Sequence, residues 1–167
     1  MLFNSLTFIF IFLPVTLVVF HLLARRGNDW LTILWLVAAS LFFYAWWNPA
    51  YLALILVSLL INYTISIAMG GAQEGFARKR LLVIAIAGNL AALGYFKYAN
   101  FFIDNSNSAL GTNFNLDTII LPLAISFFTF EQIAYQIDVY RGSTVQRSIV
   151  RYFMFVVFFP QLIAGPI

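Results

Sequence analysis

Seven polar side chains interrupt or directly follow one apolar stretch, Ile119 to Ile137, and they are the groups of the sequence best suited to chemistry. They are Ser126, Thr129, Glu131, Gln132, Tyr135, Gln136 and Asp138. On a helix, where residues advance by about 100° each, Glu131, Tyr135 and Asp138 fall on one edge, and the remaining amides continue onto the adjoining face. A carboxyl group in lipid is costly, so this face is expected to point into protein or a water-filled cavity.

Two interpretations of this polar face stay open. Glu131 could be a protonated or hydrogen-bonded packing group, or it could belong to the wall of a polar substrate path. The candidate path residues are Glu131, Gln132, Tyr135, Gln136 and Asp138. Neither interpretation makes Glu131 a catalyst, because a general base needs a partner within hydrogen-bond reach. The single histidine, His21, is close to two arginines at the end of the first apolar run, where we expect an interfacial role rather than catalysis.

The composition places these polar groups in a membrane protein. Of the 167 residues, 63% are hydrophobic and 9% are charged, whereas about a quarter of the residues of a soluble domain are charged. Cysteine is absent, which excludes disulfides, thiolate zinc sites and cysteine nucleophiles. With one histidine, neither a histidine metal cluster nor a bound cofactor is expected. The net charge of +3 does not indicate nucleic-acid binding, because the basic residues lie in loops between apolar runs.

The apolar runs predict an all-α fold, a polytopic transmembrane helical bundle with about five full spans. A span takes about 17 to 25 helical residues. The five runs of this kind are Leu6–Ala24, Leu31–Trp47, Leu52–Met69, Leu81–Tyr98 and Ile119–Ile137. A sixth, weaker run from about Ile149 to Ile163 is expected to break at Pro160 and again at Gly165 and Pro166. Residues 104–118 are predicted to form a solvated loop, and residues 1–167 a single transmembrane domain.

The basic residues predict the orientation of these spans. If the spans alternate, the loops after the first, third and fifth spans carry Arg25, Arg26, Arg78, Lys79, Arg80, Arg141, Arg147 and Arg151. Only Lys97 is left for the other side. Under the positive-inside rule these three loops are cytoplasmic and the N-terminus is outside. The aromatic residues Trp30, Tyr44, Trp46 and Trp47 are expected to be interface anchors, with a sugar-stacking platform of the last two as the alternative.

Two further patterns predict contacts between helices. Ser58, Asn62 and Ser66 are spaced at i, i+4 and i+8, which places three hydrogen-bonding groups on one stripe of a helix. Small residues recur at the same spacing in the fourth run, at Ala87, Gly88, Ala91 and Ala92. The first pattern predicts interhelical hydrogen bonds, and the second predicts close approach of another helix.

The chain also resembles a known family. The resemblance is carried by Leu121–Tyr135, Asp138–Gly142 and Phe158–Ile167, together with Met1–Ser5, Phe42–Trp47 and Gly94–Tyr98. In family order over essentially the whole chain, these segments are similar to the bacterial alginate O-acetylation branch of the membrane-bound O-acyltransferase (MBOAT) family. The residues that match the framework of the family's buried core and channel are Pro122, Ser126, Phe128, Arg141, Gly142, Pro160, Gln161, Gly165 and Pro166.

The resemblance implies an integral enzyme of the bacterial inner membrane. Such an enzyme passes an acetyl group from a cytoplasmic donor, acetyl-CoA or a similar compound, to hydroxyls of an exported polysaccharide such as alginate. The implied partners are membrane lipid, the polysaccharide acceptor and periplasmic acetylation proteins. The family's general base is a membrane-embedded histidine that follows the Gly-Pro motif, so it is expected beyond Ile167. The chain is therefore predicted to be the N-terminal portion of an acyltransferase and to be inactive alone.

Two other functions stay open. The polar fifth span and the interrupted last run are also typical of a small transporter or channel subunit. Alternatively, the chain is a structural membrane partner that docks a soluble enzyme through Arg141, Arg147 and Arg151, although solvated charge at the ends of spans explains these arginines equally well.

Overall fold

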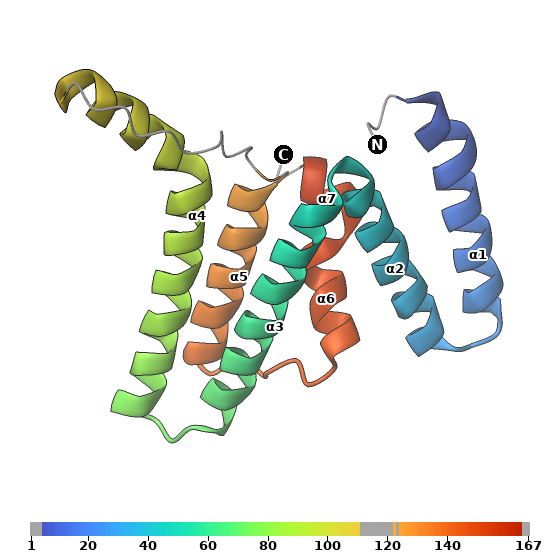
Figure 1. The fold of residues 1–167 in the computed structure, drawn as a ribbon. Helices are drawn as coiled ribbons and strands as arrows, with labels where there is room; N and C mark the ends of the chain where they lie inside the picture. Colours follow the sequence, from blue (N-terminus) through green and yellow to red (C-terminus); the bar gives the residue numbers. More distant parts are fainter. Residues whose placement is uncertain (1–4, 111–121, 123, 165–167) are drawn as a thin grey trace.

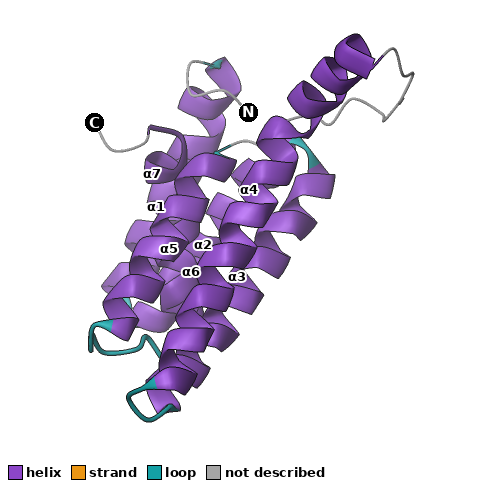
Figure 2. Ribbon diagram, turned by 90° about the vertical axis from the view of Figure 1, so that its left-hand side faces the viewer, coloured by secondary structure: helices purple, strands orange, loops and turns teal. Residues whose placement is uncertain are grey.

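The computed structural model describes residues 5–110, 122 and 124–164, and the regular secondary structure in this part of the chain is helical throughout. The predicted all-α class and polytopic bundle are confirmed. The elements are a π-helical turn η1 (Phe8–Phe12) and the helices α1 (Leu13–Arg25), α2 (Asp29–Trp47), α3 (Pro49–Gly71), α4 (Phe76–Leu110), α5 (Ile125–Tyr140), α6 (Ile149–Val157) and α7 (Phe159–Ala164). Helices α1 to α6 run alternately down and up in Figure 1, and the side view in Figure 2 shows them packed side by side.

Four helical segments of the described chain are long and apolar enough to cross a membrane. They are Phe8–Arg25, Asp29–Trp46, Pro49–Gly71 and Phe76–Ile103, and they match the first four predicted spans. The fifth predicted span contains α5, whose 16 residues extend about 24 Å at ~1.5 Å each. This is less than the ~30 Å thickness of the hydrocarbon core. Residues 119–121 and 123 of that span lie outside the described part of the chain.

Asparagine side chains begin two of the membrane helices. Asn28 Oδ1 accepts a hydrogen bond from Leu31 N at 3.1 Å, and Asn48 Oδ1 accepts one from Ala50 N at 2.9 Å. Pro49 occupies the first turn of α3, where a missing N–H costs little because it would have no partner within the helix. Asn48 is therefore both the end of α2 and the start of α3.

Helix α4 is longer than predicted at both ends. It begins at Phe76, so residues 78–80 lie in its first turns rather than in a loop. It continues to Leu110, so residues 104–110 of the predicted loop are helical, and this end bends away from the bundle (Figure 1). No glycine or proline lies between Gly94 and Gly111, so nothing in the backbone ends the helix where the sequence becomes polar. The rest of the predicted loop lies outside the described residues.

The helix boundaries around α5, α6 and α7 also differ from the prediction. Helix α5 begins at Ile125, after Pro122 and after Ala124, which has a left-handed backbone with φ of 57°. The last run breaks at Phe158 rather than at Pro160. This shift places Pro160 in the first turn of α7, where its missing N–H is tolerated. The predicted second break, at Gly165 and Pro166, lies outside the described residues.

The freed backbone at this break is held by a side chain from α2. Ser40 Oγ accepts a hydrogen bond from Phe159 N at 3.2 Å and donates to Leu36 O at 2.7 Å. Since Ser40 is completely buried, water does not replace this contact. The backbone at the interruption is thus satisfied inside the protein, as broken helices in membranes require.

Two hydrophobic clusters hold the bundle together. The main core lies where α2, α3, α5 and α6 meet, and its buried members include Tyr44, Ile55, Leu59, Ile125, Phe128, Tyr152 and Val156. An aromatic cluster joins Phe8 and Phe12 to Phe43 of α2 and Phe159 of α7, with ring centroids 5.3 to 6.1 Å apart between these elements. The aromatic cluster connects η1 to α2 and α7.

The close approach predicted for the small residues of α4 is wrong. Gly88 is exposed, and a Cβ atom placed there would meet nothing within 4 Å. The residues that α4 buries are instead Ala85, Asn89 and Leu93, which share a different face of the helix. A close approach does occur at Gly70 of α3, where a Cβ would lie 2.3 Å from Cγ2 of Val145.

The alternating helices bring the basic segments to one end of the bundle, which we call the basic end. The connections after α1, α3 and α5 all lie there (Figure 1). They carry or border the eight basic residues that the charge pattern assigns to one side. Lys97 lies further along α4, toward the opposite end.

Candidate functional site

Two of the five predicted path residues form hydrogen bonds between α5 and α3. Gln132 and Gln136 are fully buried. Gln132 Nε2 donates to Ser58 Oγ of α3 at 3.1 Å, and Gln136 Nε2 donates to the backbone carbonyl of Asn62 at 2.7 Å. Tyr152 OH of α6 donates to Gln132 Oε1 at 3.5 Å. These two side chains therefore connect α5 with α3 and α6.

An asparagine pair extends these contacts to α4. Asn89 Nδ2 donates to Asn62 Oδ1 at 2.7 Å, and Asn62 Nδ2 donates to Asn89 Oδ1 at 3.3 Å. The interhelical hydrogen bonds predicted for Ser58 and Asn62 are thus confirmed, whereas Ser66 Oγ donates to a carbonyl of its own helix. Asn62 Nδ2 also donates to the Ser58 carbonyl at 3.0 Å, which links these contacts to Gln132. We call the connected set the amide network: Ser58, Asn62, Asn89, Gln132 and Gln136.

Glu131 of α5 lies beside the break between α6 and α7. Gln161 Nε2 of α7 donates to Glu131 Oε1 at 2.5 Å. Glu131 Oε2 is buried and has no hydrogen-bond partner among the described residues. Gln136 Oε1, in the amide network, is likewise buried with no hydrogen-bond partner among the described residues. A buried oxygen without a hydrogen bond is costly, so a further donor at Glu131 Oε2 would be stabilising.

The other two predicted path residues lie nearer the basic end. Tyr135 is half-buried, and its hydroxyl accepts a hydrogen bond from Gln146 N at 2.9 Å. Asp138 is exposed. The structure therefore joins Gln132 and Gln136 in one network, places Glu131 against Gln161, and leaves Asp138 apart from both. A substrate path along this face stays a prediction.

The residues of the predicted framework motif occupy both the interior and the turns. Phe128 is 2% exposed, Pro122 is buried and Ser126 is half-buried. Arg141 ends α5, and Gly142 follows it with a φ of 105°, a backbone conformation that favours glycine. Pro160 and Gln161 belong to the first turn of α7. Gly165 and Pro166 lie outside the described residues.

Three further residues make contacts that the sequence analysis did not identify. Arg78 Nη2 donates to the carbonyl of Val139 at the end of α5, at 2.6 Å. In the sequence, nothing distinguishes Arg78 from its basic neighbours Lys79 and Arg80, which indicate only the orientation of the spans. Asn89 had a usable signal, because it is a lone amide within the apolar run Leu81–Tyr98. Ser40 had none, since a single serine in an apolar run more often bonds to its own helix.

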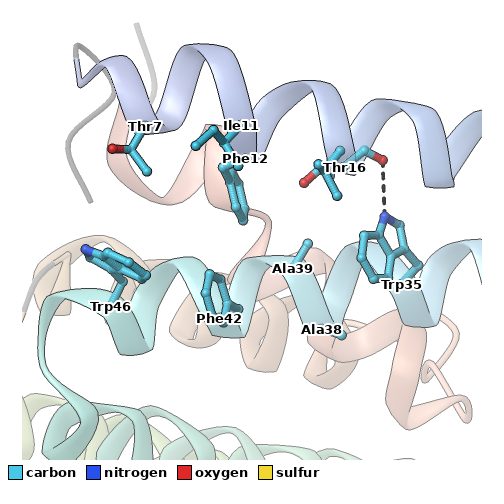
Figure 3. Close-up of a pocket in the computed structure, with 10 residues that line it drawn as sticks. Thr7, Ile11, Phe12, Thr16, Trp35, Ala38, Ala39, Phe42 and Trp46 are labelled. Carbon is cyan, nitrogen blue, oxygen red and sulfur yellow. Dashed lines mark hydrogen bonds between the residues drawn. The ribbon is translucent and has the colours of Figure 1, made fainter.

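A groove between α1 and α2 has a different character. Its volume is about 690 Å³, and its lining includes Phe12, Thr16, Trp35, Phe42 and Trp46. Figure 3 shows Trp35 and Trp46 toward its two ends, and Trp35 Nε1 donates to the carbonyl of Thr16 at 3.1 Å. Its described lining residues are apolar side chains, threonines and tryptophans, none of them titratable.

The described part of the chain has few side chains suited to acid–base or metal chemistry. His21 is exposed on α1, near the basic end. Among the residues that the structure describes, no group of three or more histidine, aspartate or glutamate side chains is placed to hold a metal ion.

Comparison with known proteins identifies the chain's relatives. It is 39% identical over its whole length to a peptidoglycan O-acetyltransferase of Helicobacter pylori and covers 37% of that protein. It is 43% and 42% identical, again over its whole length, to probable alginate O-acetylases AlgI of Pseudomonas putida and Pseudomonas aeruginosa, of which it covers 35% and 32%. This similarity agrees with the resemblance to the MBOAT family. The chain spans about a third of the length of the curated relatives it matches.

Neither a family model nor a solved structure matches the chain. The comparison therefore depends on the similarity of the whole chain to about a third of each named O-acetylating protein, and it agrees with the resemblance carried by the motifs around α5 and α7.

Proposed function

We propose that this chain forms part of a membrane O-acetyltransferase that transfers an acetyl group to hydroxyls of an exported polysaccharide such as alginate. The observation that carries the proposal is the similarity of the entire chain, at 36% to 43% identity, to proteins named peptidoglycan O-acetyltransferase and alginate O-acetylase. Both names describe O-acetylation of a glycan. The acyl donor in this proposal is acetyl-CoA or a similar compound.

Glu131 and Gln161 are the groups that we assign to the acceptor path. Acetyl transfer forms a bond between the acceptor oxygen and the acetyl carbon, breaks the bond between that carbon and the donor, and moves the hydroxyl proton to a base. Glu131 Oε2, buried and without a partner among the described residues, can accept a hydrogen bond from an approaching hydroxyl and so orient it. We assign the base and the oxyanion donors to residues outside this chain. The one histidine of the chain, His21, is exposed near the basic end.

The proposed orientation places the basic end in the cytoplasm of a bacterial inner membrane and the N-terminus outside. The positive-inside rule supports it, because the basic residues concentrate at one end of the bundle. The donor would then approach from the basic end. The polysaccharide, with any periplasmic acetylation proteins, would approach from the end where α7 lies (Figure 1).

A chimera tests this function. The chain would replace the aligned stretch of the P. putida protein named probable alginate O-acetylase, to which it is 43% identical, in a strain that lacks its own copy. We expect the chimera to restore ester-linked acetate on alginate. Replacing Glu131 by alanine should lower the acetate at least about tenfold, since an orienting contact is lost. The matched control is Glu74→Ala, at a carboxyl whose side chain is 92% exposed.

The two parts of the proposal fail separately. A chimera that reaches the membrane in normal amount but adds no acetate would contradict the proposed function. An active chimera in which Glu131→Ala and Glu74→Ala behave alike would contradict only the role of Glu131 in the acceptor path.

A further inference from the structure

A polar pocket at the basic end is unexplained by the proposed acetyl transfer. It has a volume of about 830 Å³ and lies between the end of α3, the start of α4 and the segment 141–148 that connects α5 to α6. Its lining includes Tyr63, Glu74, Arg78, Ser143, Thr144 and Arg147. We call it the loop pocket.

Contacts from two helices, α3 and α5, hold the wall of the loop pocket in place. Tyr63 OH of α3 donates to the backbone carbonyl of Arg147 at 2.5 Å. Val145 packs so closely on Gly70 that a Cβ at that position would lie 2.3 Å from its Cγ2. On the other side, Tyr135 OH of α5 accepts a hydrogen bond from Gln146 N. A segment held in this way offers its side chains from a preformed position, which reduces the entropy lost on binding.

The charged and polar groups of the loop pocket favour an anion. Arg78 and Arg147 supply two guanidinium groups, and Ser143 and Thr144 supply two hydroxyls. The one acidic residue that lines it, Glu74, lies 3.5 Å from Arg78 but is 92% exposed, so its charge is largely screened by water. The other basic residues of this end add to the positive potential.

Arg78 in particular has donor capacity to spare. Its side chain is 13% exposed, one of its Nη atoms bonds to the Val139 carbonyl, and its Nε is buried without a hydrogen-bond partner among the described residues. Guanidinium groups bind phosphate with paired, charge-assisted hydrogen bonds, and hydroxyl donors complement them. Two arginines and two hydroxyls around one cavity match this chemistry.

We propose that the loop pocket binds a phosphate group. The phosphate comes either from the headgroup of an anionic phospholipid, because the pocket lies at the end of membrane-crossing helices, or from a soluble phosphate compound. This inference goes beyond the proposed acetyl transfer and does not depend on it.

Arg147→Gln is the variant that tests the inference, and Arg141→Gln is its matched control. Both arginines are exposed and lie in the same connection between α5 and α6, but Arg147 lines the pocket and Arg141 does not appear in its lining. The two variants therefore lower the charge of the basic end equally. Helix content by circular dichroism should be the same for both, since neither side chain is buried.

Two measurements on the 167-residue chain distinguish the sources. In the first, the chain is extracted from nanodiscs of phosphatidylcholine with phosphatidylglycerol, and native mass spectrometry counts the phosphatidylglycerol retained. In the second, binding of inorganic pyrophosphate to the chain in uncharged detergent is measured by calorimetry at constant ionic strength. We expect Arg147→Gln to weaken one of these about tenfold, the usual effect of losing a charge-assisted hydrogen bond, and Arg141→Gln to leave it within about twofold.

A selective loss of phosphatidylglycerol would identify a lipid headgroup, and a selective loss of pyrophosphate would identify a soluble compound. Equal losses in the two variants would overturn the inference, because general surface charge would then explain the binding. The absence of any binding by the unmodified chain in both measurements would overturn it as well.

Discussion

Replacing Asn89 by leucine should destabilise the bundle through the amide network rather than through packing. Asn89 is 6% exposed and exchanges two hydrogen bonds with Asn62, at 2.7 and 3.3 Å. Its third bond, to the carbonyl of Ala85, stays within α4. Leucine has room at this position, because Asn89 borders a cavity of about 240 Å³ between α3 and α4. The expected loss is therefore that of two interhelical hydrogen bonds.

The magnitude follows from the cost of such bonds inside a membrane protein. Each is worth about 0.6 kcal/mol on average and up to about 1.7 kcal/mol, so Asn89→Leu should lower the free energy of unfolding by about 1–2 kcal/mol. Asn62 keeps its bonds to the Ser58 carbonyl and to Gln136, so the loss should not exceed this range. Unfolding by sodium dodecyl sulfate in mixed micelles, followed by far-ultraviolet circular dichroism, measures it.

A double-mutant cycle identifies the partner. Asn62→Leu, Asn89→Leu and the combined variant should give a coupling energy of at least about 0.6 kcal/mol. The matched control is Asn105→Leu, because Asn105 is an exposed asparagine of the same helix that bonds to its own helix at Phe101 O. Its effect should stay within about 0.5 kcal/mol. A coupling energy within about 0.3 kcal/mol of zero would refute the interhelical contact between the two asparagines.

Three further predictions follow from other contacts of the bundle. Gly70→Ala should destabilise it by about 1–3 kcal/mol through overpacking, because its Cβ would lie 2.3 Å from Val145 Cγ2, and Val145→Ala should restore most of the loss; no rescue would mean that the contact is not the cause. Ser40→Ala should cost about 1–2 kcal/mol because Phe159 N loses its buried acceptor, while Ser66→Ala, whose hydroxyl bonds within its own helix, should cost less in the same unfolding assay. Because the chain has no cysteine, single introduced cysteines can report the topology: those at positions 26 and 80 should be shielded from a membrane-impermeant maleimide applied to whole cells, and one at position 48 should be labelled. Labelling of positions 26 and 80 from opposite sides would contradict the alternating topology.

Much of the fold was predictable because the bilayer restricts what a chain can do. A spanning segment must be apolar over about 20 residues and must satisfy its backbone internally, so the positions of the first four helices could be identified from apolar runs alone. The grouping of the basic residues at one end followed from charge alternation. Helix ends were less predictable, since α4 continues through a polar stretch that contains no breaker, and the last run breaks at Phe158 so that Pro160 falls in a first turn.

The candidate site was predictable only in part. Periodicity identified the polar face of α5, and similarity of motifs identified the segments around it, but neither reveals how that helix is rotated against its neighbours. Gln136 meets Asn62 across 74 residues, and Glu131 meets Gln161 across 30. The sequence by itself determined which segments enter the membrane, in which alternation, and which side chains share a helical face. Only the tertiary structure decided that Gln132 and Gln136 bond to other helices while one Glu131 oxygen meets no partner in the part of the chain that is described. A hydrogen bond depends on the placement of both groups within about 3 Å, and packing between distant segments sets that placement.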